Sequence, residues 1–95
     1  MIKVKFWGVR GSIPCPGPRT MKYGGNTACI ELRFPEVNRH IIIDAGSGIR
    51  DLANFMLAND LPKGPISTEI YLSHTHWDHI MGFPFFVPVY IPGTK

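Results

Sequence analysis

The sequence predicts a small α/β domain, in which a sheet rich in β-hairpins carries one flanking helix. Two observations predict this class: several short segments alternate apolar and polar residues, and one segment spaces its apolar residues as a helix does. A third is that glycine- and proline-rich connections separate these segments. A chain of 95 residues has room for one domain at most.

Alternation identifies the strands. Ile2, Val4 and Phe6 alternate with lysines, which is the period of a half-buried strand. The segment 28–34 alternates in the same way and has one polar face, and the three isoleucines beginning at Ile41 suit a strand covered on both faces. We expect these last two segments to pair as a hairpin. The predicted strands cover residues 2–7, 28–34, 40–44 and 69–73.

One helix is expected after the third strand. From Ile49 onward, apolar residues fall at i, i+3, i+4, i+7 and i+8, which predicts a helix over about residues 49–58 with Ser47 as its N-cap. The segment 8–27 holds five glycines and three prolines, so it is a long loop and a candidate wall of an active site. The apolar segment 80–91 is broken by prolines, which predicts short helical turns or an irregular edge strand.

Composition excludes several classes of protein. Hydrophobic residues make up 44% and charged residues 18%, a globular balance that excludes wholesale disorder. No apolar run approaches the roughly 20 residues of a membrane helix, so we expect a cytoplasmic protein with no membrane partner. Cys15 and Cys29 fit no metal or redox spacing and are expected as free thiols. The net charge of +3 comes from scattered basic residues, so a dedicated nucleic-acid surface is not expected. A mild positive bias would help attract a phosphate ester, but the favoured alternative is a small basic domain that carries this charge without a partner.

The strongest signal is a cluster of metal-binding residue types, with the sequence HTHWDH at positions 74–79. In extended chain His74, His76 and Asp78 point to one side, and a change to helical geometry near residue 77 would bring His79 toward them. Imidazole nitrogens and a carboxylate suit Zn²⁺, and also Fe²⁺ or Mn²⁺. The alternative is an exposed histidine-rich loop in which Asp78 caps a helix. The aromatic residues nearby, Trp77 and the cluster 83–86, are expected to pack in the core.

This motif resembles the signature of the metallo-β-lactamase fold hydrolases. Three further segments resemble their phosphodiesterase-like branch, the ribonuclease Z-like and phosphoribosyl cyclic phosphodiesterase enzymes: WGVRGSIP at 7–14, YGGNT at 23–27 and IDAGSGIR at 43–50. The resemblance implies a four-layer αβ/βα sandwich of two similar halves. Residues 1–95 would then be a single incomplete domain, the N-terminal half of that sandwich.

The resemblance also implies roles for the motif residues. His74 and His76 would bind the first of two zinc ions, Asp78 and His79 the second, and Asp78 would belong to the catalytic machinery. A water shared by the ions would be the nucleophile, because paired cations lower the pKa of bound water and stabilise the attacking and leaving oxygens.

Other residues have expected roles with open alternatives. Asp44 resembles the family's aspartate that supports the metal-binding loop, and its alternative is a turn carboxylate before a glycine. Arg10, Ser12, Asn26 and Thr27 lie in or beside the glycine-rich loop, where backbone N–H groups could approach a substrate phosphate; ordinary turn chemistry is the alternative.

The family's later metal donors have no counterpart here, since no His follows His79 and no Asp follows Asp78. We therefore expect the parent activity to be metal-dependent hydrolysis of a phosphodiester substrate, namely a cyclic nucleotide, a cyclic sugar phosphate or RNA, with this chain inactive alone. The alternative is a non-catalytic metal-binding or structural fragment. The expected protein partner of this chain is a second copy in a homo-oligomer or a complementary C-terminal half.

Overall fold

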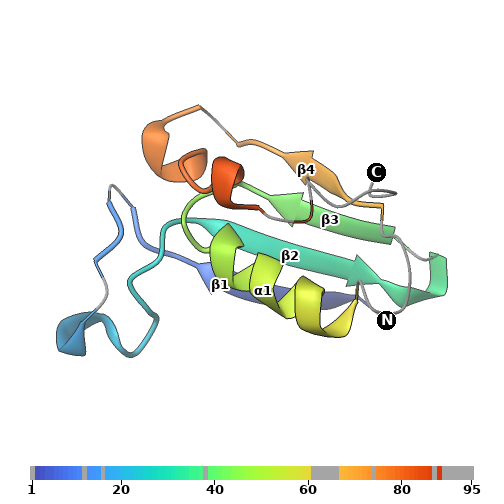
Figure 1. Cartoon of the computed structure of the whole chain (residues 1–95), viewed down its shortest axis with the longest axis horizontal. Coiled ribbons are helices and arrows are strands. Elements are labelled where there is room, and N and C mark those ends of the chain that lie inside the picture. The colour runs from blue at the N-terminus through green and yellow to red at the C-terminus, as the bar shows by residue number, and fades with distance from the viewer. Residues whose placement is uncertain are drawn as a thin grey trace.

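In the part of the chain that the structure describes, a four-stranded mixed sheet forms one layer and one α-helix lies in the other (Figure 1). This computed structural model describes residues 2–11, 13–15, 17–37, 39–60, 67–73, 75–86 and 88. The strands are β1 (Lys3–Gly8), β2 (Cys29–Phe34), β3 (Arg39–Ile43) and β4 (Glu69–Tyr71), and the helix is α1 (Ile49–Asn59). Short 3₁₀ turns are η1 (Pro18–Thr20), η2 (Pro35–Val37), η4 (Trp77–His79) and η5 (Phe83–Phe85).

The sheet order is β1-β2-β3-β4. The first three strands are antiparallel neighbours, which confirms the predicted hairpin of β2 and β3, while β3 and β4 are parallel. A parallel pair needs a crossover connection, and α1 lies in it. The fourth strand is shorter than predicted, since it ends at Tyr71 rather than at Ser73.

The predicted helix is confirmed, but its cap is not. Four residues of its apolar face are buried: Ile49, Leu52, Ala53 and Met56. The helix begins after Gly48 without a side-chain cap. The Ser47 hydroxyl instead accepts a hydrogen bond from the Thr27 N–H at 2.9 Å, so tertiary contact has replaced the expected local cap.

The core lies between α1 and the sheet. Its buried members are Cys29, Ile42, Ala45, Ile49, Leu52, Ala53, Met56 and Phe86, with Trp7 and Ile70 packed against them. Both cysteines are free thiols, as expected. Among the described residues, no helix is long and apolar enough to cross a membrane.

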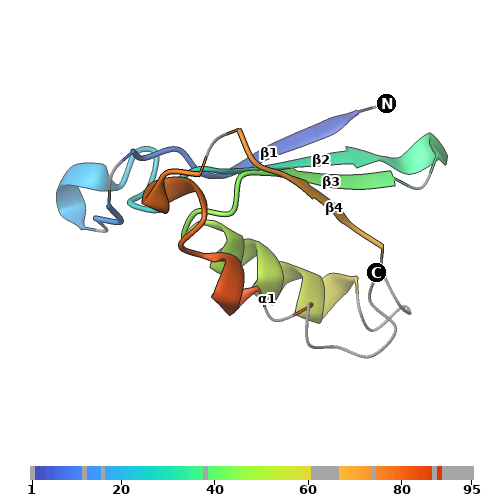
Figure 2. The same cartoon turned by 90° about the horizontal axis from the view of Figure 1, so that it is seen from above.

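The more apolar face of the sheet is the one that α1 does not cover. The pairing register places Phe6, Ile30 and Ile43 in one row across this outer face. Figure 2 shows α1 on the opposite side of the sheet and no described element over the outer face. The first strand is confirmed as a strand, but its expected half-burial is wrong, because Val4 and Phe6 are 54% and 62% exposed.

The third strand differs from its prediction for the same reason. Ile42 points toward α1 and is fully buried, whereas Ile41 and Ile43 lie on the outer face and are only half-buried. The segment 80–91 does form a short helical turn, η5, over its described part, while residues 87 and 89–91 lie outside the described residues.

Candidate functional site

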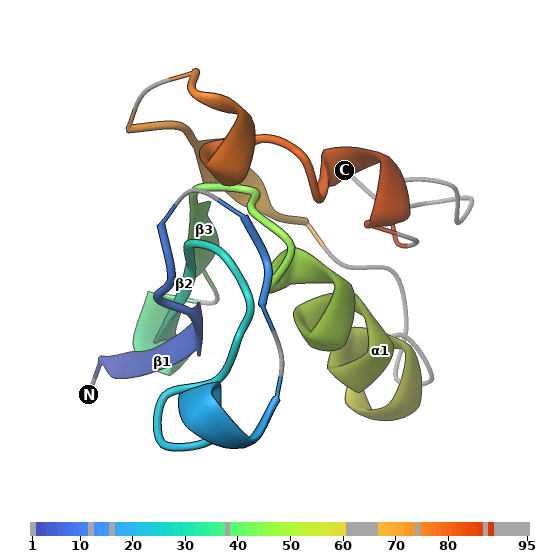
Figure 3. The ribbon, with the colours of Figure 1, turned by 90° about the vertical axis from the view of Figure 1, so that its left-hand side faces the viewer.

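The candidate site lies at one end of the sheet, where β1, β3 and β4 end. The loop after β1, the turn after β3 and the η4 turn after β4 meet at this end (Figure 3). Asp44 directly follows β3, and Asp78 and His79 lie in η4. The helical geometry expected near residue 77 is present, and it begins at Trp77.

Asp44 is the centre of a hydrogen-bond cluster. Its carboxylate accepts bonds from the Ser73 N–H at 2.7 Å and from the Ser73 hydroxyl at 2.7 Å, and it lies 2.9 Å from His79 Nδ1. Burial raises the pKa of Asp44, but the bonds from Ser73 and His79 outweigh burial and lower the pKa below its usual value. Asp44 is therefore held as a carboxylate that orients an imidazole.

The backbone of Asp44 is also unusual. Its φ of 67° lies in the left-handed region, which non-glycine residues rarely adopt. Aspartate tolerates this region better than most residues, and such strain concentrates at functional sites. The conformation turns the chain sharply at the end of β3 while keeping the carboxylate beside Ser73 and His79.

His79 connects two carboxylates. Because an ionised carboxylate can only accept, the bond to Asp44 places the proton of a neutral imidazole on Nδ1. The other nitrogen, Nε2, then presents a lone pair at 3.2 Å from Asp78 Oδ2. An imidazole nitrogen and a carboxylate oxygen are both ligand types that zinc accepts.

The spacing of these two atoms fits metal ligands. Zinc binds histidine nitrogen and carboxylate oxygen at about 2.0–2.2 Å, so two ligands at angles of about 90–110° lie about 3.0–3.4 Å apart. The 3.2 Å between His79 Nε2 and Asp78 Oδ2 falls inside this interval. Asp44 on the far nitrogen is the carboxylate partner that metal-binding histidines usually have.

The rest of the predicted donor set is only partly described. His74 lies outside the described residues. His76 is exposed and extended, and it directly precedes η4. Within the described part of the chain, no group of three His, Cys, Asp or Glu side chains is placed to hold a metal ion. The four-ligand set therefore stays a prediction, and the described contacts concern Asp78 and His79.

Close backbone packing supports the turn after β3. A Cβ at Gly46 would overlap the Asp78 carbonyl oxygen and lie 2.5 Å from Thr27 Oγ1. The neighbouring Ala45 N–H donates to the His79 carbonyl at 2.8 Å, and the Gly82 N–H donates to the Ala45 carbonyl at 2.8 Å. These contacts require glycine at position 46 and fix the turn against η4.

Asn26 and Thr27 form hydrogen bonds with Ser47 in the turn after β3. Thr27 is fully buried and accepts a bond from the Ser47 N–H at 2.7 Å. Asn26 accepts a bond from the Ser47 hydroxyl and donates to Asp51 at 2.9 Å. These contacts favour the structural alternative for both residues, and a role in binding substrate stays a prediction.

The loop after β1 borders the motif. A Cβ at Gly11 would lie 4.0 Å from Asp78 Oδ2, so the loop forms a wall beside that carboxylate. Arg10 is part-buried, and its Nε donates to the Ile13 carbonyl at 2.8 Å. Ser12 lies outside the described residues.

The aromatic residues around the motif differ from expectation. Trp77, Phe83 and Phe85 are 65%, 46% and 60% exposed, so their assignment to the core was wrong, while Phe86 is buried. No described element covers these three rings. This end of the sheet therefore presents exposed rings beside polar donors.

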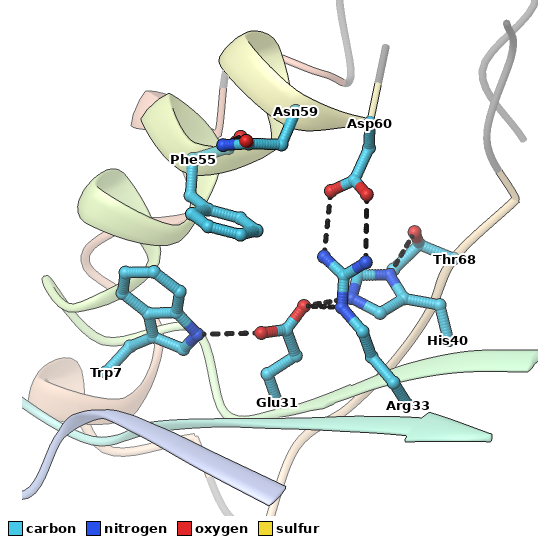
Figure 4. Close-up of polar contacts among 8 residues, drawn as sticks. All are labelled: Trp7, Glu31, Arg33, His40, Phe55, Asn59, Asp60 and Thr68. Atoms are coloured by element: carbon cyan, nitrogen blue, oxygen red, sulfur yellow. Dashed lines mark hydrogen bonds and ion pairs between the residues drawn. The ribbon is translucent and has the colours of Figure 1, made fainter. Parts of the chain in front are cut away.

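Sequence reasoning missed a buried polar cluster on the other side of the core (Figure 4). Glu31 is 3% exposed and accepts bonds from Trp7 Nε1 at 3.0 Å and Arg33 Nε at 2.7 Å, and it lies 2.7 Å from His40 Nε2. Arg33 also forms a bidentate pair with Asp60, with both distances 2.8 Å. The polar face predicted for the second strand was the only signal of this cluster.

The electrostatics of the cluster follow from these contacts. Burial raises the pKa of Glu31, but the bonds from His40, Trp7 and Arg33 outweigh burial and lower it to about 2. The cluster is therefore an ionised network between β2, β3 and the end of α1, and it supports the fold rather than the end of the sheet that carries the motif.

We compared the chain with protein-family models, with curated proteins and with solved structures, and none of the three comparisons found a match.

Proposed function

We propose that this domain is the N-terminal half of a metallo-β-lactamase αβ/βα sandwich, taken from a metal-dependent hydrolase of phosphodiester bonds. The substrate class is a cyclic nucleotide, a cyclic sugar phosphate or RNA. The single observation that carries the proposal is the chain of contacts from Asp44 through His79 to Asp78. A buried carboxylate that orients one imidazole nitrogen while the other faces a second carboxylate is the arrangement expected around a bound cation.

His74, His76, Asp78 and His79 are the residues that would hold the metal, with zinc as the first candidate and Mn²⁺ or Fe²⁺ as alternatives. When bound, the metal would supply an activated water near neutral pH. The protein's own contribution is orientation: Asp44 fixes the His79 ring, and the packing at Gly46 fixes Asp44 relative to η4.

The polarity of the sheet supports the half-sandwich. Val4, Leu32 and Ile41 form an apolar row on the face that α1 leaves uncovered. Sheets that are apolar on a face bury that face against a second layer. A second half of similar construction would bury this row and would also bring the missing metal donors.

A zinc titration of the metal-free chain tests the site. We expect measurable binding in the unmodified chain, its loss in His76→Ala, and an affinity about 10- to 100-fold lower in Asp44→Asn, which keeps the shape of the side chain but loses its charge. Cys15→Ser is the matched control, because Cys15 is the exposed thiol that could bind zinc by itself. Equal zinc affinity in the unmodified chain and His76→Ala would overturn the assignment.

A second candidate function is a non-catalytic structural fragment completed by self-association or by another polypeptide. The same uncovered sheet face favours it, since Val4 and Phe6 remain exposed. Metal content and turnover measured on the same sample separate the cases. Light scattering combined with hydrolysis of bis(p-nitrophenyl) phosphate in added Zn²⁺ or Mn²⁺ tests the half-fold that both cases share. We expect association and negligible turnover. A monomer that turned over this substrate at about 1 s⁻¹ or faster would show that the half-fold proposal is wrong.

A further inference from the structure

A pocket of about 240 Å³ lies within the loop that joins β1 to β2. Its lining residues are Val9, Arg10, Arg19, Lys22, Tyr23 and Gly24, so half of them are cations. The basic residues that are scattered in sequence are thus gathered by the folding of this loop. Figure 3 shows the loop at the same end of the sheet as η4.

The backbone holds the two limbs of this loop together. The Arg10 N–H donates to the Asn26 carbonyl at 3.0 Å, and the Cys15 N–H donates to the Gly25 carbonyl at 2.8 Å. The bond from Arg10 Nε to the Ile13 carbonyl also fixes the direction of that guanidinium. A pocket whose walls are tied in this way loses less conformational entropy when it binds a ligand.

The three cations of the pocket differ from the arginines on the sheet, because the sheet arginines are paired with carboxylates. Arg33 is paired with Glu31 and Asp60, and Arg39 is paired with Glu69. Within the described part of the chain, Arg10, Arg19 and Lys22 form no ion pair with a carboxylate. The reason is visible in the sequence, because the first 30 residues contain no aspartate or glutamate. The pocket therefore keeps its positive potential for an external anion.

Tyr23 adds an aromatic surface to this positive pocket. Its side chain is 73% exposed, and Lys22 Nζ lies 5.3 Å from the centre of its ring. Arginine and lysine are the usual partners of phosphate, and an exposed tyrosine ring beside them stacks readily with a base. The pocket is smaller than the roughly 300–1,000 Å³ that enclose a drug-sized ligand, so a phosphate fits inside and a base would lie against the exposed ring.

We propose that this pocket binds a nucleoside monophosphate group, either as a free nucleotide or as the end of a strand. Arg10, Arg19 and Lys22 hold the phosphate, and Tyr23 stacks on the base. The site needs no metal. It borders the motif all the same, since Gly11, which follows Arg10, faces Asp78.

Isothermal titration of the chain in the presence of a chelator tests this proposal without involving the metal motif. The probes are adenosine monophosphate, ribose 5-phosphate, adenosine and a trinucleotide with a terminal phosphate. We expect the nucleotide to bind more tightly than ribose 5-phosphate, and adenosine to bind weakest. A trinucleotide that binds tenfold or more tightly than the mononucleotide would identify a strand end as the ligand, and equal affinities would identify the free nucleotide.

The variants separate the phosphate contacts from the stacking. Arg19→Ala combined with Lys22→Ala should lower the affinity for both phosphate probes about tenfold or more. Tyr23→Ala should lower nucleotide affinity about fivefold or more and leave ribose 5-phosphate unaffected, while Tyr23→Phe should behave as the unmodified chain. Lys3→Ala is the control for the loss of a positive charge outside the pocket, because Lys3 lies at the start of β1.

Three results would overturn the proposal. The first is that the nucleotide does not bind at millimolar concentration. The second is that Lys3→Ala lowers the affinity for the phosphate probes as much as the double variant does. The third is that Tyr23→Ala and Tyr23→Phe bind the nucleotide with equal affinity. The four substituted side chains are suitable for replacement without loss of fold, because Lys3, Arg19, Lys22 and Tyr23 are all exposed. Circular dichroism of each variant checks that the fold is kept.

Discussion

Glu31→Gln should destabilise the domain by removing the charge at the centre of its buried polar cluster. Gln keeps the size of the side chain and one acceptor oxygen, which can still receive the Trp7 N–H. Its NH₂ group takes the place of the other carboxylate oxygen, which lies 2.7 Å from both Arg33 Nε and His40 Nε2. An NH₂ group donates and cannot accept hydrogen bonds from these two nitrogens. The substitution therefore leaves donors that are already removed from water without an anionic partner.

The expected loss can be worked in two ways. Hydrogen bonds to a charged group contribute about 1.5–3 kcal/mol each, but Arg33 retains Asp60, so we expect a net loss of about 2–4 kcal/mol. The pKa of Glu31 gives a similar figure: its fall from 4.5 to about 2 on folding corresponds to about 3 kcal/mol. This is a large part of the stability of a small domain.

The loss should depend on pH in a defined direction. The folded-state pKa of Glu31 is lower than the unfolded-state value, so its contribution is fully present above about pH 4.5 and is lost as pH falls toward 2. The difference in stability between the unmodified chain and Glu31→Gln should therefore be full at pH 7 and should shrink by about half or more at pH 3.

Urea unfolding followed by tryptophan fluorescence at the two pH values measures this difference. With a slope of about 1–1.5 kcal/mol per molar urea, the midpoint at pH 7 should fall by roughly 2 M. Glu69→Gln is the matched control, because its pair with Arg39 is solvent-exposed and should leave the midpoint unchanged. A difference for Glu31→Gln below about 1 kcal/mol at pH 7, or one of equal size at pH 3, would refute the reasoning.

Three further predictions concern other parts of the molecule. Gly46→Ala should lower the free energy of unfolding by about 2 kcal/mol or more, because its Cβ would overlap the Asp78 carbonyl oxygen. Gly11→Ala is the control and should change the free energy of unfolding little, because its Cβ would meet only an oxygen at 4.0 Å. Thermal unfolding of both variants measures the difference, and equal losses of stability would contradict the prediction. Phe6→Lys, which places a charge on the uncovered sheet face, should shift the chain toward monomer in light scattering, and an unchanged distribution would argue against association through this face. Cys15 should react with a thiol reagent in the folded state and Cys29 only after unfolding, since burial raises the pKa of Cys29 to about 12; two fast-reacting thiols in the folded state would contradict this.

Local periodicity was sufficient to predict the strands and the helix, but not which face of the sheet the helix covers. The alternation in the strands and the helical spacing after Ile49 depend only on neighbours in sequence, and both elements were confirmed. Which face of the sheet carries the helix depends on partners far along the chain. Glu31 can be buried only because Arg33 and His40 form hydrogen bonds with its carboxylate and Asp60 pairs with Arg33. The pattern of one sequence segment does not contain this information.

The candidate site divides in a similar way. The motif predicted helical geometry near residue 77 that brings His79 toward Asp78, and His79 Nε2 lies 3.2 Å from Asp78 Oδ2. Their role as metal donors stays a prediction. The left-handed backbone of Asp44 and the loss of Ser47 as a helix cap arise from packing between the turn, the loop and η4. Such contacts follow from the assembled fold, so no local signal could have predicted them.

The spacing of the paired strands along the chain has a consequence for the order of folding. Phe34 and Arg39 of the β2–β3 hairpin are five positions apart, whereas Phe6 pairs with Ile30 and Ile42 with Ile70, each across more than twenty positions. The entropy of closing a loop grows with the logarithm of its length, so the distant pairings cost about 1–2 kcal/mol more than the hairpin before they gain any contact. We therefore expect β2 and β3 to form the earliest stable structure and β1 and β4 to join it later as the two edges of the sheet. The strand that leads into the motif then belongs to the last part of the sheet to close and the first to open, and anything that binds at its end slows that opening.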